Sequence, residues 1–206
     1  NEYIHVEKPD QEAVPSRQFD ISKIDFELLS REFAHTRRKN LLLRDLDELV
    51  NQQLAKMLFA NPQRIDYYDR YQEIIDAYNA EQNRATIEKT FMDLMELASS
   101  LDTEQQRYVR EGFSSDEELS VYDLLFSENL TKQEIETIKK VSVDLLTKIK
   151  QQIAKLDHWT DKQETKAIVD NLIRNTLWQE LPNSYDVSDI QTYQKKIYEY
   201  VYMRYP

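Results

Sequence analysis

The longest uninterrupted apolar stripe of the sequence follows Thr131. Apolar residues recur there at steps of three, four or seven, the spacing that places side chains on one face of a helix. They are Ile135, Ile138, Leu145, Ile149, Ile153 and Leu156. Two capping boxes, Ser115 with Glu118 and Thr131 with Glu134, would satisfy the free amides of two helix starts. The stretch therefore predicts two successive helices, the second running to about Leu156.

The first half of the chain shows the same helical spacing after a leader that lacks it. Residues 1–18 contain two prolines and no helical period, so we expect an extended leader or linker. Helices are expected next around Phe26 to Phe33 and over residues 39–60. Asn61-Pro62 should end the latter and start another helix, because proline is tolerated at the first helical position. The apolar positions that follow are Tyr67, Tyr71, Ile74, Ile75 and Tyr78, and then Ile87, Phe91, Leu94, Ala98 and Leu101.

A boundary is expected near the only glycine. Thr103 with Gln106 should open a brief helix that Gly112 closes, since glycine takes a left-handed cap without steric cost. We therefore expect a first helical half at 19–112 and a second at 113–206. The predicted fold class is all-α, a multi-helix bundle with two packed helical halves.

Two more helices are expected after the central stretch. Thr160 with Gln163 and Ser188 with Gln191 are candidate caps for them. The first has an apolar side formed by Ile168, Val169, Leu172, Ile173 and Leu177. The last carries Tyr193, Ile197, Tyr198, Tyr200, Val201, Tyr202 and Tyr205.

Composition supports the all-α prediction and narrows the chemistry. The 206 residues include one glycine, five prolines and no cysteine. A chain so poor in glycine cannot form a P-loop or a dinucleotide fingerprint, which need close backbone approach to phosphates. Without cysteine there is no disulfide, thiolate metal site or cysteine nucleophile. No run approaches the roughly 18 apolar residues of a membrane span. The expectation is a cytoplasmic chain without a membrane segment.

Candidate catalytic residues are few. His5, His35 and His158 are far apart in the sequence and match no metal-ligand spacing. Glu32 and His35 form one E-x-x-H step, but a di-iron bundle needs a second step and further carboxylates. Acidic pairs such as Glu117-Glu118 are expected to be solvated or to cap helices. We expect no catalytic, cofactor or metal site within these residues.

The net charge of −11 argues against strong nucleic-acid binding, which usually requires a basic domain. The exception is Arg37-Arg38-Lys39, the only run of three basic residues. Because acidic residues flank it, a solvated face is favoured over phosphate contact. At most weak phosphate contacts are expected from this run.

The aromatic residues provide a second candidate site. The chain has 13 Tyr, 7 Phe and 2 Trp, and its last helix carries tyrosines on several faces. Tyr198 and Tyr200 lie about 200° apart on a helix, whereas Tyr202 and Tyr205 follow the side of Tyr198. We predict that Tyr198, Tyr202 and Tyr205 form a partner interface, with packing in the chain's own core as the open alternative.

Both tryptophans, Trp159 and Trp178, are interpreted as core or interface anchors. The acidic background of the chain makes a base-stacking role for them the weaker interpretation.

Several segments together resemble a known family. The order of these segments, rather than any catalytic signature, carries the resemblance, which extends from Phe19 to Tyr205. The block from Asp116 to Leu146 resembles the C-terminal helical region of type I restriction enzyme R subunits. The resemblance also includes the helix before this block and the Trp-containing and Tyr-rich segments after it. The matching segments are Lys39-Asn40-Leu41 through Asp47-Glu48-Leu49, Asp116 through Leu125, Leu130-Thr131 with Glu134, Lys139-Lys140-Val141, Asp144-Leu145-Leu146, Trp159, Leu181-Pro182, Lys195 and Tyr200-Val201-Tyr202.

The resemblance implies a piece of a larger motor-nuclease subunit that cuts foreign DNA after ATP-driven translocation. In that family the nuclease and the motor, which use ATP and Mg²⁺, precede this region. The region itself is expected to be non-catalytic, to brace the motor and to dock it onto the methyltransferase core. The methylation and specificity subunits and the subunit's own motor are the implied partners. The alternatives are a regulatory helical scaffold unrelated to restriction and, more weakly, an accessory element of the DNA path that uses Arg37, Arg38 and Lys39.

Overall fold

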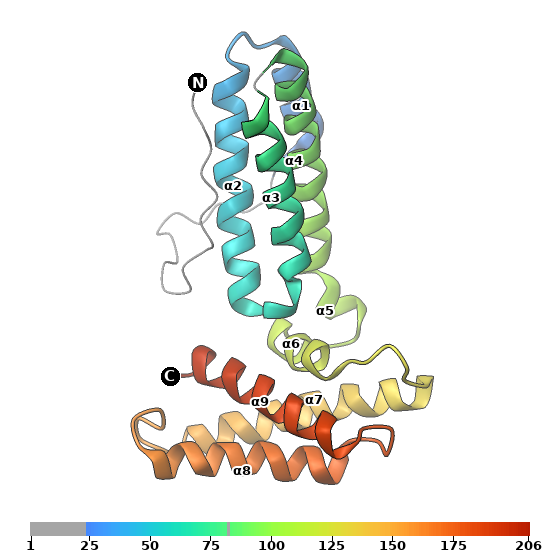
Figure 1. Ribbon diagram of the computed structural model, residues 1–206, viewed down its shortest axis with the longest axis vertical. Coiled ribbons are helices and arrows are strands. Elements are labelled where there is room, and N and C mark those ends of the chain that lie inside the picture. The colour runs from blue at the N-terminus through green and yellow to red at the C-terminus, as the bar shows by residue number, and fades with distance from the viewer. Residues whose placement is uncertain (1–23, 82) are drawn as a thin grey trace. The chain divides into compact units, whose positions relative to one another are not determined.

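The computed structural model describes residues 24–81 and 83–206, and this part of the chain is an all-α multi-helix bundle (Figure 1). Of the described residues 80% are helical, and none of them is in a strand. The predicted fold class is therefore confirmed. The elements are α1 (Phe26–His35), α2 (Lys39–Ala60), the 3₁₀ helix η2 (Pro62–Arg64), α3 (Ile65–Ala80), α4 (Arg84–Gln105), α5 (Arg107–Arg110), α6 (Asp116–Leu125), α7 (Lys132–Ile153), α8 (Gln163–Glu180) and α9 (Val187–Arg204).

The chain divides into two compact units, residues 1–107 and 108–206. The division falls within α5, slightly before the boundary expected at Gly112. Each unit has a separate cluster of buried apolar residues. The predicted leader, residues 1–18, lies outside the described residues.

In the first unit, α2, α3 and α4 lie side by side (Figure 1). The predicted helix over 39–60 coincides with α2. Its buried apolar stripe runs through Leu43, whereas Leu42 is only partly buried. Three consecutive leucines, Leu41-Leu42-Leu43, do not indicate by their spacing which of them faces the core, so packing against the neighbouring helices selects the one that is buried. Core residues contributed by the other helices are Phe33, Tyr68, Tyr71, Ile74, Ile75, Tyr78, Phe91, Leu94, Met95, Leu97, Ala98 and Leu101.

Two polar pairs are buried in the first unit. The Tyr71 hydroxyl donates to Oδ1 of Asp47 over 2.8 Å. The Arg64 guanidinium contacts Oε1 of Glu104 at 3.1 Å. A buried charge without a partner is strongly destabilising, so each of these pairs constrains how its helices pack. Both pairs join residues more than 20 positions apart and would not form in an isolated helix.

In the second unit, α6, α7, α8 and α9 form a closed cycle of neighbours, since α6 contacts α7 and α9, and α8 contacts α7 and α9. The Tyr185 hydroxyl donates to the carbonyl of Leu125 over 2.7 Å and ties the loop before α9 to the end of α6. The core at the centre of the cycle contains Leu119, Val121, Leu125, Ile138, Leu145, Ile149, Trp159, Val169, Ile173, Leu177, Ile197 and Val201.

The central helix starts lie where the capping pattern predicted them. Thr131 and Glu134 form the full capping box of α7, which ends at Ile153, three residues before the expected end. Ser115 accepts from the Glu118 amide as expected, but the Glu118 carboxylate accepts from the Ser114 amide and not from that of Ser115. Asn61 ends α2 and caps the following turn, whose first residue is Pro62, as predicted.

Two of the other predicted caps are wrong. Thr160 does not cap α8, whose N-cap is Lys162 without a side-chain hydrogen bond. The cap of α9 is Asp186, which forms a capping box with Asp189, so Ser188 lies inside the helix. A carboxylate at this position also gains from the positive N-terminal end of the helix, which favours the earlier start.

The predicted helix start at Thr103 is also wrong. Helix α4 continues through Thr103 to Gln105. Leu101 is fully buried in the last part of α4, and Glu104 there is held by Arg64, so tertiary contacts stabilise the extra turn. The role of Gly112 is confirmed, because its φ of 83° lies in the left-handed region that glycine favours.

Candidate functional site

The first candidate site is the C-terminal helix with its tyrosines. Helix α9 buries Ile197, Tyr200 and Val201 against the rest of the second unit. Tyr202 is 39% exposed, while Tyr198 and Tyr205 are half-buried at the edge of the core. Burial raises the pKa of Tyr200 to about 12 and also raises the pKa of Tyr198. The hydroxyls of Tyr198 and Tyr200 therefore stay neutral at physiological pH.

Trp159 contacts all three candidate tyrosines. It is only 1% exposed and follows a turn in which His158 has a φ of 45°. The rings of Tyr198 and Tyr202 meet the indole edge-on, with centroids 6.1 and 5.8 Å away. The indole N–H donates to the carbonyl of Tyr205, at the end of α9. The predicted interface residues therefore also fix the end of α9 onto the body of the unit.

A charged network surrounds the end of α9. The Glu117 carboxylate of α6 pairs with Lys150 of α7 and lies 3.6 Å from the Arg204 guanidinium. Burial acts to raise the pKa of Glu117, but the hydrogen bond from Lys150 and the nearby cations outweigh it and lower the pKa. Lys150 also lies over the Tyr205 ring, 5.4 Å from its centroid. Three helices are thus joined at this end of α9.

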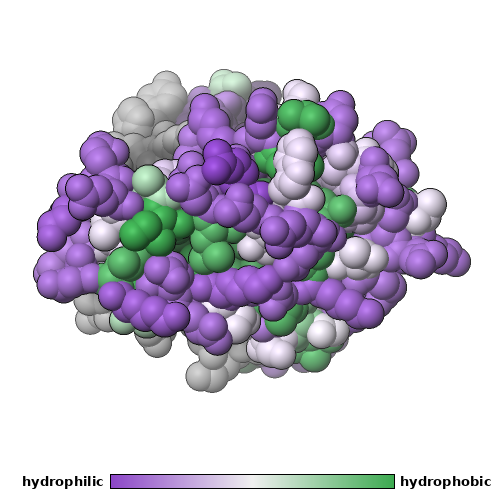
Figure 2. All heavy atoms as spheres, turned by 90° about the horizontal axis from the view of Figure 1, so that it is seen from below, coloured by the Kyte–Doolittle hydropathy of each residue, from purple (hydrophilic) through white to green (hydrophobic). Residues whose placement is uncertain are grey.

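Large apolar side chains remain exposed on α8 and α9. Trp178 is 58% exposed and is the clearest case, since a tryptophan side chain has the largest apolar surface to leave in water. Figure 2, seen from the side on which α8 lies in Figure 1, shows apolar residues gathered among hydrophilic ones. The exposed apolar residues of these two helices are Ile168, Trp178, Val187, Tyr202 and Met203.

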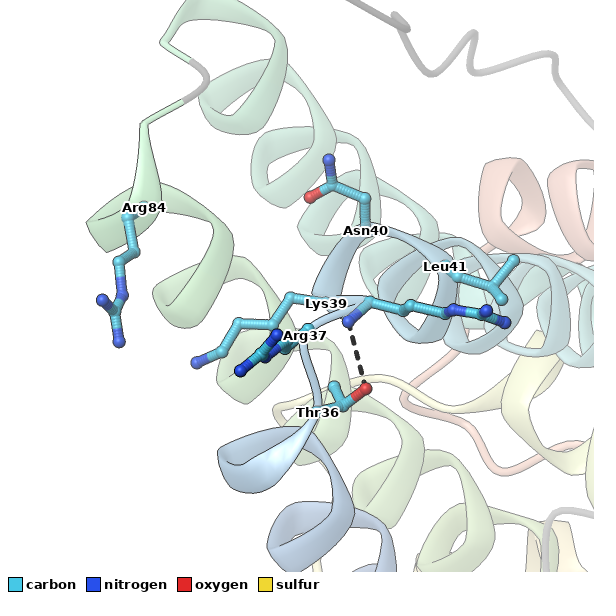
Figure 3. A pocket seen from close by; sticks show the side chains of 7 residues that line it. Thr36, Arg37, Lys39, Asn40, Leu41 and Arg84 are labelled. Atoms are coloured by element: carbon cyan, nitrogen blue, oxygen red, sulfur yellow. Dashed lines mark hydrogen bonds between the residues drawn. The ribbon is translucent and has the colours of Figure 1, made fainter.

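The second candidate site is the basic run at the turn between α1 and α2. Residues 36–41 and Arg84 line a cavity of about 600 Å³ (Figure 3). The Arg38 amide donates to Oγ1 of Thr36 over 3.1 Å and shapes the turn. Lys39 is not a free cation, because its ammonium contacts Oε1 of Glu88 at 2.7 Å and lies over the Phe33 ring. Arg37 and Arg38 are exposed.

Sequence reasoning missed Arg84 and Glu88, which α4 contributes to this site. Arg84 is the first residue of α4, after the cap Asn83, and its guanidinium lies 3.2 Å from Glu88. Asn83 is a recognisable helix start, so the position of Arg84 on α4 was predictable. No local pattern relates residue 84 to residue 37, and only the packing of α1 and α2 against α4 brings them together.

The histidines do not assemble a site within the described residues. His35 and His158 are exposed and lie in different units, while His5 lies outside the described part of the chain. Glu32 and His35 are both exposed on α1. In the described ranges, no three side chains of the His, Cys, Asp or Glu type are grouped so that they could hold a metal ion. Among the same residues, no helix combines the length and apolarity that crossing a membrane requires.

The fold places this protein in the class of all-α multi-helix bundle domains. Comparison with known families is more specific. Residues 12–204 match the family described as type I restriction enzyme HindI endonuclease subunit-like, C-terminal. The chain belongs to this family, which confirms the resemblance to the C-terminal region of R subunits. No curated protein and no solved structure shows significant similarity to the chain. Family membership favours an R-subunit domain over an unrelated helical scaffold.

Proposed function

We propose that this chain is the non-catalytic C-terminal helical domain of a type I restriction enzyme R subunit, and that it docks the subunit onto the methyltransferase core. In the same proposal the domain braces the subunit's own motor. ATP hydrolysis and Mg²⁺-dependent cleavage would belong to other domains of the full-length subunit. The support is the family match together with the exposed aromatic surface of the second unit.

The exposure of Trp178 is the observation that carries the docking proposal. A few aromatic residues commonly dominate the free energy of binding at an interface, and tryptophan and tyrosine are enriched among them. Trp178 lies on α8 and is more than half exposed, although a core lined by leucine, isoleucine and valine lies on the other side of that helix. Tyr202 is the most exposed of the three tyrosines predicted for the interface.

The roles of the three tyrosines are unequal in this proposal. The Tyr198 ring meets Trp159 edge-on, and both Tyr198 and Tyr205 are partly buried against the core, so replacing them would disturb the core together with any interface. Tyr202 also touches Trp159, but it keeps a large exposed surface. A test of docking therefore uses the exposed pair Trp178 and Tyr202 and avoids the two half-buried rings.

The test measures binding of the 206-residue chain to a purified complex of methylation and specificity subunits by isothermal titration calorimetry. Trp178→Ser combined with Tyr202→Ser should weaken binding at least about tenfold, as expected when aromatic anchors are lost. Helical content should stay constant, because both side chains lie at the surface. A matched control is Leu28→Ser with Met92→Ser, which removes side chains of similar exposure, 52% and 57%, from the first unit.

The result that supports docking through α8 and α9 is a loss of affinity in the first variant and not in the control. Equal affinity of the wild type and the Trp178/Tyr202 variant would show that docking uses another surface. A wild-type chain that does not bind the complex at all would overturn the docking proposal itself.

A further inference from the structure

The cavity at the α1–α2 turn is lined by cations from two distant segments of the first unit. Arg37, Arg38 and Lys39 come from the turn and the start of α2, and Arg84 comes from the start of α4. In Figure 3 the side chains of Arg37 and Lys39 extend toward the side on which Arg84 lies. Basic residues at four positions thus line a cavity of about 600 Å³ in a chain whose net charge is −11.

The charges around the cavity do not cancel. Glu88 is the carboxylate that contacts the group, and it pairs with both Lys39 and Arg84. The hydrogen bonds from these two cations lower the pKa of Glu88, so it holds them in place as a carboxylate at neutral pH. Arg37 and Arg38 form no ion pair with any residue in the described ranges. Their guanidinium groups are left to solvent or to an anionic ligand.

The first residues of α2 also line the cavity, and a helix start supplies free backbone amides as donors. The N-cap of α2 is Arg38, no side chain from the described residues caps the first turn, and no acidic residue occurs there. Amides at a helix start point outward and favour negative charge, but they are only a supporting feature here. The four basic residues that line the cavity are the main reason to expect an anionic ligand there. Arginine is especially suited to phosphate, because its planar fork donates two parallel hydrogen bonds.

We propose that the cavity formed by residues 36–41 and Arg84 binds backbone phosphates of DNA. The choice of DNA rests on membership in a restriction endonuclease subunit family, and the proposal does not depend on docking through α8 and α9. Contacts of this kind position a protein on DNA without reading its sequence. Arg37 and Arg38 pair with no carboxylate of the described residues, while Lys39 and Arg84 share the single carboxylate of Glu88, so the four basic residues together keep a positive charge for the ligand. The expected affinity is low at physiological salt because the rest of the chain is acidic.

The test is fluorescence anisotropy of a labelled random-sequence duplex of about 20 base pairs, titrated with the 206-residue chain over a range of salt concentrations. Arg37→Ala with Arg84→Ala should reduce the affinity at low salt about tenfold or more. The slope of log K against log salt should become shallower by about two, since each lost phosphate contact removes about 0.9. Arg37→Lys with Arg84→Lys keeps the charge but loses the fork, so it should retain part of the affinity and most of the slope.

The matched control is Lys155→Ala with Arg174→Ala, which removes two exposed cations from the second unit and changes the net charge equally. The control should bind DNA nearly as the wild type does. An equal loss in the control and in the Arg37/Arg84 variant would overturn the proposal, because net charge alone would then explain the binding. A wild-type chain without measurable binding at the lowest salt would also overturn it. Neither result bears on binding to the methyltransferase complex, so this proposal and docking fail separately.

Discussion

Asp47 has an unusual environment for a carboxylate, since it is buried on α2 and its only hydrogen-bond donor among the described side chains is the Tyr71 hydroxyl. Burial raises the pKa of Asp47 above its ordinary 3.8; the bond from Tyr71 acts to lower it, and Glu48 acts to raise it. The same pairing and burial raise the pKa of Tyr71. The folded state therefore favours the protonated form of Asp47 more than the unfolded state does.

Asp47→Asn should stabilise the protein at neutral pH, because the amide keeps an acceptor for Tyr71 and carries no charge. The folded pKa is raised, so the stability contributed by Asp47 is greatest below pH 3.8 and is lost as the pH rises through the folded pKa. The gain from Asn should accordingly be small near pH 3, rise with pH and reach on the order of 1 kcal/mol at neutral pH. Urea unfolding followed by circular dichroism across this pH range measures it.

Asp45→Asn is the matched control, because Asp45 is exposed on the same helix, two positions before Asp47. Its effect should not follow the pH profile expected for Asp47→Asn. If Asp47→Asn instead destabilises the protein at neutral pH, the carboxylate is required in its ionised form and the interpretation of the Tyr71 pair is wrong.

At the scale of the element, a capping box fixes the start of α7. Thr131 and Glu134 satisfy each other's backbone amides at the start of α7, with the Thr131 amide 2.8 Å from the Glu134 carboxylate. The bonds from Thr131 lower the pKa of Glu134, so this carboxylate stays ionised to a lower pH than an ordinary glutamate. Helix α7 is the longest element of the second unit, which makes its start important for the whole bundle.

Thr131→Ala should lower the free energy of unfolding by about 1 kcal/mol, the usual loss when a threonine N-cap is replaced by alanine. Chemical denaturation of the full chain measures the change. Thr137→Ala provides the comparison, since Thr137 is half-buried within the same helix and its hydroxyl only donates to the carbonyl of Gln133. A loss that is equal at both positions would indicate a general effect of removing threonine from α7 and not a capping effect.

At the scale of the whole molecule, the two units have separate cores. The first core is built around Leu54, Ile75 and Leu97, and the second around Leu145, Ile173 and Val201, with no buried residue shared between the two clusters. The strongest helix contacts also lie within the units. A unit with its own closed core has the principal requirement for folding alone.

Residues 1–107 and 108–206 should therefore fold when they are produced separately. Each piece should be helical by circular dichroism and unfold in one cooperative transition, because each retains its complete buried cluster. The sum of the two spectra should match that of the full chain. A piece that lacks a cooperative transition would show that its core depends on the other unit.

The sequence alone determined the class of the fold and most of the helices. Helix caps and the 3.6-residue spacing depend on residues only a few positions apart. The sequence therefore predicts the helix start at Thr131 and the helix over residues 39–60. The order of degenerate helical blocks was enough to indicate the family, although none of the blocks is a catalytic signature. Local rules left the helix start open where two capping residues competed, as between Asp186 and Ser188, because either side chain can cap a helix.

Only the tertiary structure decided which side chains face solvent and which distant residues meet. Nothing in the sequence distinguishes Trp159 from Trp178 as a core or interface residue, yet Trp159 is in the core and Trp178 is exposed. Arg84 joins the basic run across 44 intervening residues through the packing of α4. The physical reason is that periodicity sets which residues share a helix face, whereas the neighbouring helices set which face is buried. The candidate sites of this protein depend on the second factor.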